Sequence, residues 1–122
     1  MPVKVAVKLE DQMAKPALKR RLRMLKLVRD ELCDIGFILP GSIVKRFMRC
    51  GRKGCACQTN PKAVHGPYHD WTRKVDGKTV SIRLTEKEAS LLIKWVEDKN
   101  RLYGLVTKME RIGLEAAKLI RE

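Results

Sequence analysis

Residues 49–71 read RCGRKGCACQTNPKAVHGPYHDW, and this stretch concentrates the sulfur and imidazole of the chain. Three of the four cysteines lie between Cys50 and Cys57, and both histidines follow within the same stretch. The loop from Gly51 to Val64 is polar and contains almost no apolar side chains that could form a core. We therefore expect a bound ion, rather than burial of apolar surface, to hold this loop in one conformation.

The expected metal is zinc, because thiolate sulfur and imidazole nitrogen are the ligands that zinc prefers in tetrahedral sites. The candidate ligands are Cys50, Cys55, Cys57 and His65. His65 directly precedes Gly66, where the chain must turn into the next element, while His69 stays open as the alternative fourth ligand. The odd number of clustered cysteines disfavours a disulfide, and the C-x-x-C spacing of a redox site is absent.

The charge of the chain is strongly positive, with a formal net charge of +13 over 122 residues. Residues 1–62 carry 15 basic and 5 acidic side chains, against 12 and 9 in residues 63–122. Such an excess attracts polyanions, nucleic acid first and an anionic membrane surface second. Because no run of about 18 apolar residues is present and the N-terminus lacks the apolar region of a secretory signal, we expect a cytoplasmic protein without a membrane span.

The fold class expected from the pattern of elements is α+β, with one three-stranded antiparallel β element between two helices. The expected segments are a flexible tail over 1–14, a helix over 15–36, a zinc loop and β-hairpin over 42–84, and a long helix over 86–121. Residues 15–122 would form a single zinc-stabilised domain. Apolar residues recur at helical spacing from Leu18 to Ile35, and Cys33 is expected to be core sulfur. Gly36 is expected to end the first helix in the left-handed conformation.

The clearest hairpin pattern is YHDWTRKVDGKTVSIRL at 68–84. Asp76 and Gly77 favour a type I′ turn, because both central residues of that turn take positive φ. This turn fixes a register in which Asp70 faces Arg83 as an oppositely charged cross-strand pair on the polar side of the ribbon.

The long helix begins at a TEKE capping box, residues 85–88, in which the threonine and the second glutamate bond each other's amides. A seam of period 3.5 then runs from Leu92 to Ile120, as is typical of a coiled coil. A helix over 86–121 would be about 54 Å long, about twice the length of the first helix. The first helix is too short to cover the whole seam, so the excess requires a second copy, which we favour, another partner, or a break near Gly104 or Gly113. Packing within the chain is the alternative for the first half of the seam.

The cysteine pattern, the HGPY element, the hairpin and the long helix together resemble a small group of prokaryotic and phage-borne domains of unknown function. The resemblance covers roughly residues 41–110. It implies that the three clustered cysteines and His65 hold the metal, with Gly66, Pro67 and Tyr68 forming the turn behind it. Genes of this group often lie beside transposases and integrases, which implies a mobile-element or regulatory role on DNA.

The expected function is nucleic-acid binding, with DNA favoured over RNA. Phosphate contacts would come from cations on the first helix, the first strand, the tip of the cysteine loop and the hairpin. These candidates are Lys15, Lys19, Arg23, Lys26, Lys45, Arg46, Arg49, Arg52, Lys53, Arg73, Lys74 and Lys78. The alternative is an interaction adaptor or a subunit of a nucleoprotein complex that assembles through the C-terminal helix, as a homodimer or with another protein. Catalysis is not expected, because four protein ligands leave zinc no open position.

Overall fold

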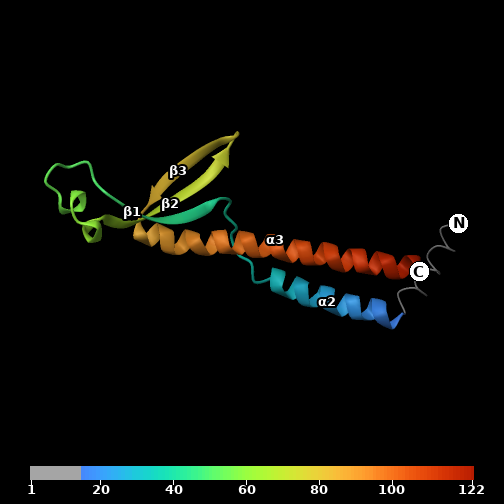
Figure 1. Cartoon of the computed structure of the whole chain (residues 1–122). Coiled ribbons are helices and arrows are strands. Elements are labelled where there is room, and N and C mark those ends of the chain that lie inside the picture. Colours follow the sequence, from blue (N-terminus) through green and yellow to red (C-terminus); the bar gives the residue numbers. More distant parts are fainter. Residues whose placement is uncertain (1–14) are drawn as a thin grey trace. The chain divides into compact units, whose positions relative to one another are not determined.

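The computed structural model describes residues 15–122, so the tail expected over 1–14 lies outside the described residues. The α+β prediction is confirmed (Figure 1). In chain order the elements are α2 (Pro16–Leu32), β1 (Ser42–Met48), β2 (His65–Val75), β3 (Lys78–Leu84) and α3 (Glu86–Arg121), with two short 3₁₀ helices, η1 (Ala56–Gln58) and η2 (Pro61–Ala63), between β1 and β2.

The described chain divides into two compact units. The helical unit holds the described residues up to Gly36 together with Asn100–Glu122, and the sheet unit is Phe37–Lys99. The boundary falls within α3, which continues through both of its glycines to Arg121, as the sequence predicts. Neither described helix, α2 or α3, offers an apolar stretch long enough to cross a bilayer.

In the helical unit, α2 runs along the C-terminal part of α3 (Figure 1). The buried cluster is formed by Val28, Leu105 and Ile112. Nε of Arg21 in α2 lies 2.7 Å from the carboxylate of Glu115 in α3, so an ion pair also joins the two helices. The first helix therefore packs on α3 from Leu105 onward and does not cover the first half of the seam, which was the alternative to self-association there. The seam positions from Leu92 to Lys99 belong to the sheet unit, where the N–H of Leu39, in the loop before β1, donates to the carbonyl oxygen of Trp95 at 3.1 Å.

The end of α2 also differs from the prediction. The helix ends at Leu32, and the N–H of Cys33 donates to the carbonyl oxygen of Asp30 at 3.2 Å. Because Cys33 keeps a right-handed φ of −66°, the last turn closes without a left-handed glycine, and Gly36 has no positive φ. Cys33 lies at this helix end and is exposed, so the prediction that it is core sulfur is wrong as well.

In the sheet unit the strands form an antiparallel sheet in the order β1-β2-β3. The predicted hairpin register is confirmed, with Asp70 opposite Arg83. Asp76 and Gly77 have φ of 50° and 79°, as a type I′ turn requires. The hairpin is therefore specified by local sequence.

The capping box at the start of α3 is confirmed too. The hydroxyl oxygen of Thr85 accepts from the N–H of Glu88 at 3.1 Å, and the Glu88 carboxylate accepts from the N–H of Thr85 at 2.8 Å. The N–H of Thr85 holds the pKa of Glu88 below its usual value, so this carboxylate stays ionised at the positive end of the helix. The capping box therefore allows α3 to begin at Glu86, with Thr85 as the single residue between the helix and the end of β3.

Candidate metal centre

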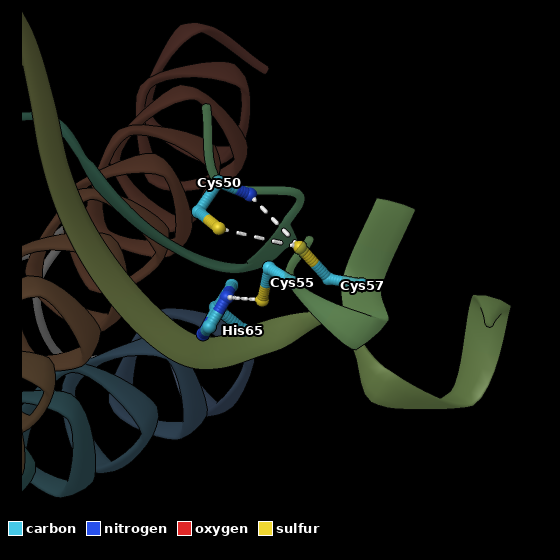
Figure 2. A group of neighbouring side chains, drawn as sticks. All are labelled: Cys50, Cys55, Cys57 and His65. Carbon is cyan, nitrogen blue, oxygen red and sulfur yellow. Dashed lines mark hydrogen bonds between the residues drawn. The ribbon is translucent and has the colours of Figure 1, made fainter. Parts of the chain in front are cut away.

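Four side chains of the sheet unit converge at one end of the sheet (Figure 2). They belong to Cys50, Cys55, Cys57 and His65, and their ligand atoms all lie within 4.8 Å of one another. The Sγ atoms of Cys50 and Cys57 are 3.4 Å apart, and Sγ of Cys55 is 3.3 Å from Nε2 of His65. Three thiols and one imidazole at these separations are compatible with a metal site.

The loop between β1 and β2 brings these side chains together with its own backbone. Cys50 follows the end of β1, and its N–H donates to Sγ of Cys57 at 3.3 Å. Cys57 lies in η1, and Gly54, with a φ of +83°, makes the turn that leads into it. The side-chain oxygen of Asn60 accepts from the N–H of Lys62 at 3.0 Å and starts η2, so the chain folds back toward β2.

His65 reaches the cluster because the first residues of β2 pass very close to β1. Met48 pairs with His65, and the register shifts between Arg46 and Met48. At Gly66, a Cβ atom would lie 2.7 Å from the carbonyl oxygen of Arg46 and 3.1 Å from Cδ1 of Phe47. With a φ of +135°, Gly66 occupies a conformation that few other residues adopt. Glycine at this position is what permits the close approach.

The two cysteine thiols at the centre of the cluster differ in acidity. The backbone N–H of Cys57, followed by side-chain hydrogen bonds from Cys57, Cys50 and His65, lowers the pKa of Cys55 from 9.0 to about 6. Burial raises the pKa of Cys57, whose side chain is completely inaccessible to solvent. Of these two thiols, Cys55 therefore ionises at the lower pH, and burial disfavours the thiolate form of Cys57.

The other histidine and the fourth cysteine lie elsewhere. His69 is on the sheet, where it pairs with Lys45 on one side and Leu84 on the other. Cys33 belongs to the helical unit. Of the two histidines that the sequence left open, His65 is the one in the cluster.

The predicted phosphate contacts are divided between the two units. The helical unit contains Lys15, Lys19, Arg23 and Lys26, and the sheet unit contains Lys45, Arg46, Arg49, Arg52, Lys53, Arg73, Lys74 and Lys78. Most of these side chains are exposed. Arg73 is an exception, because its guanidinium lies 4.7 Å from the ring of Trp71 and its Nε is buried without a hydrogen-bond partner. Lys15 donates from Nζ to the carbonyl oxygen of Leu119 at 3.4 Å.

Side chains alternate along a strand, so the strand cations of the sheet unit also divide between its two faces. Arg46 pairs with Tyr68, and Asp70 pairs with Arg83, which places these four on one face of the sheet. We call this surface, Arg46, Tyr68, Asp70 and Arg83, the arginine face. Lys74 projects on the same side as the arginine face, whereas Lys45, Arg73 and Lys78 project from the opposite side.

Three members of the arginine face, Tyr68, Asp70 and Arg83, are absent from the residues predicted to contact nucleic acid. The hairpin register predicted the partner of Arg83. It did not predict that Arg83 lies beside Met48 of β1. That contact depends on how β1 pairs with β2, and the register of this pairing shifts between Arg46 and Met48, beside Gly66. The neighbouring HGPY motif was the available signal, since it marks where β2 begins.

Comparison with curated proteins and with solved structures gives no significant match to this chain. One family model does match, and it extends over α2, the sheet, the cysteine loop and the beginning of α3. Its match to residues 15–93, more than half of the chain, shows that the protein belongs to the family described as a domain of unknown function, DUF6788.

Proposed function

We propose that this protein is a zinc-stabilised nucleic-acid-binding module and that DNA is its preferred partner. The observation that carries the proposal is the Cys₃His cluster at the end of a sheet whose neighbouring surface is rich in arginine and lysine. The cluster would hold the ion, and the cations around it would contact phosphates.

Zinc fits the donor set and its dimensions. With thiolate ligands at about 2.3 Å and imidazole at about 2.0–2.1 Å, tetrahedral geometry separates two sulfur atoms by about 3.8 Å and a sulfur from a nitrogen by about 3.5 Å. The separations of 3.4 Å between the Cys50 and Cys57 sulfurs and 3.3 Å between Cys55 and His65 are slightly shorter than these values, and all four ligand atoms lie within 4.8 Å of one another. Four protein ligands fill a tetrahedral site, which favours a structural ion over a catalytic one.

The loop has little else to hold it. Among residues 49–64, Cys57 is the only buried one. The loop has hydrogen bonds of its own, such as the one from the side chain of Gln58 to the carbonyl oxygen of Cys50, but these do not form a core. A loop of this kind gains its folding free energy largely from the metal, so metal binding and order of the loop are coupled.

Nucleic acid is favoured as the partner by the sign and placement of the charge. Arg49, Arg52 and Lys53 are all exposed at or near the cysteine loop, and no acidic residue lies between Asp34 and Asp70. Aromatic residues make up 5% of the chain, which disfavours a platform that stacks successive unpaired bases and so favours duplex DNA.

The test is the salt dependence of binding to a labelled DNA duplex of about 20 bp, measured by fluorescence anisotropy with zinc-loaded full-length protein between about 50 and 200 mM salt. The logarithm of the binding constant should fall linearly with the logarithm of the salt concentration, by about 0.9 for each phosphate neutralised. An RNA duplex of matching sequence should bind more weakly. Failure to bind, or a flat salt response, would remove the proposal.

A second candidate function, protein–protein association, is favoured by the helical unit. Its two helices expose large apolar side chains, with Leu27 67%, Tyr103 62% and Leu114 73% accessible. A homodimer through α3 would cover Tyr103 and Leu114, two of the exposed apolar side chains of that helix. Light scattering after gel filtration at high salt, with nucleic acid removed, should give twice the chain mass for a dimer and the single mass if α3 does not self-associate.

A further inference from the structure

The arginine face contains a carboxylate that holds two guanidinium groups. Asp70 is 9% exposed, and its Oδ1 lies 3.1 Å from Nε of Arg83 and its Oδ2 3.4 Å from Nε of Arg46. Hydrogen bonding from Arg83 keeps the pKa of Asp70 below its usual value, so the carboxylate is ionised at neutral pH. One negative charge is thus shared by two positive charges, and the group retains a net charge of about +1 beside the sheet.

Arg83 is fixed on three sides. Its Nε is bonded to Asp70, its guanidinium carbon lies 4.1 Å from the centre of the Tyr68 ring, and its Nη2 lies 3.2 Å from Sδ of Met48. A thioether is a weak acceptor. A ligand that offers a charged oxygen in place of this sulfur would therefore form a stronger hydrogen bond with a side chain whose rotamer is already set.

A pocket of about 180 Å³ lies between the Cys₃His cluster and the arginine face. The lining residues are Met48, Arg49, Cys50, His65, Tyr68 and Arg83. Two of them, Cys50 and His65, belong to the Cys₃His cluster, so binding of a metal there would fix one wall of the pocket. Arg49 has no hydrogen bond or ion pair in the described structure and is exposed at the pocket.

We propose that this pocket binds a backbone phosphate of the nucleic acid, with Arg49 and Arg83 as the phosphate-binding residues. The inference rests on the proposed function and names the site through which it acts. The strong polar groups of the pocket are the two guanidiniums, which only donate hydrogen bonds. A phosphate, which only accepts, matches them better than a base edge, which presents donors as well as acceptors.

The test compares Arg49→Ala with Lys87→Ala in zinc-loaded full-length protein, using a fluorescein-labelled DNA duplex. Both substitutions remove one exposed positive charge from the sheet unit, and neither side chain has a hydrogen bond or ion pair in the described structure. Loss of a charge-assisted phosphate contact should weaken binding by Arg49→Ala about tenfold. It should also lower the magnitude of the salt slope by about 0.9. Lys87→Ala should change the affinity less than about twofold, because it removes no direct contact.

Arg83→Lys is the second variant, because it keeps a cation beside Asp70 while removing the planar fork; a loss similar to that of Arg49→Ala is expected. The losses should be equal on three duplexes of unrelated sequence, whereas a sequence-dependent loss would mean a base contact and would overturn the assignment. If the wild type binds and Arg49→Ala behaves like Lys87→Ala, the pocket is wrong and the proposed function stands. If the wild type does not bind, both fall.

Discussion

Substitution of Gly66 by alanine tests whether the close pairing of β1 and β2 is what delivers His65 to the cluster. The added Cβ would lie 2.7 Å from the carbonyl oxygen of Arg46 and 3.1 Å from Cδ1 of Phe47, and the residue would have to keep a φ of +135°. Backbone strain of this kind costs about 1–3 kcal/mol, and the contact with the β1 carbonyl adds to it because backbone must move. We expect the free energy of unfolding to fall by about 2–4 kcal/mol.

Two measurements check this expectation on zinc-loaded protein: urea unfolding followed by tryptophan fluorescence, and transfer of the metal to a competing chelator. Gly51→Ala is the matched control. A Cβ at Gly51 would meet no atom within 4 Å, and the residue lies in the cysteine loop that precedes β2. It should change stability by no more than about 0.5 kcal/mol. Equal behaviour of the two variants in both assays would refute the reasoning, whereas loss of stability with unchanged chelator competition would show that His65 does not depend on this pairing.

Three further predictions concern the rest of the fold. Arg83 lowers the pKa of Asp70 below its usual value of 3.8, so the stabilisation by this pair is complete well above pH 3.8 and is lost as the pH falls below it. The difference in urea midpoint between wild type and Asp70→Asn should therefore be smaller at pH 3 than at pH 7. A constant difference would contradict the pairing. Thr85→Ala removes the N-cap of α3 and should lower the free energy of unfolding by about 1 kcal/mol in urea titration, with no change counting against the capping box. Ile112→Ala should lower it by about 2–5 kcal/mol and Leu114→Ala by far less, since Ile112 is 4% exposed and Leu114 73%; similar losses would contradict the helix pairing.

Local sequence predicted the parts of the fold that depend on short-range chemistry. Asp76 and Gly77 determined the hairpin register, because a type I′ turn admits few other residue pairs. The pair Thr85 and Glu88 marked the start of α3 for a similar reason, since each side chain bonds the other's backbone amide. In both cases the decisive contacts join residues only a few positions apart.

Contacts between distant segments were harder to predict. The seam on α3 is apolar along most of its length, so periodicity alone could not decide which half α2 covers. The answer depends on pairs such as Val28 with Leu105 and Arg21 with Glu115. Arg83 was likewise known to face Asp70, but its place beside the cluster follows from the pairing of β1 with β2, which no single motif specifies.

The same distinction applies to the candidate site. The four Cys and His side chains were predictable as a group because they lie within sixteen residues and because their donor atoms suit one ion. The sequence left His65 and His69 open, since both follow the cysteines closely. The choice between them depends on position along β2: His65 is the first residue of the strand, next to the cysteine loop, whereas His69 lies four residues further into the sheet between Lys45 and Leu84.

The measurement that tests the central claim most directly is the metal content of protein purified under reducing conditions, determined by inductively coupled plasma mass spectrometry. Wild type should carry about one zinc ion per chain, and Cys57→Ala should carry much less, because it removes the buried ligand. After chelation of the wild type, the amides of residues 49–64 should exchange faster with deuterium. Wild-type protein without a transition metal, or a loop whose exchange is the same before and after chelation, would contradict the account.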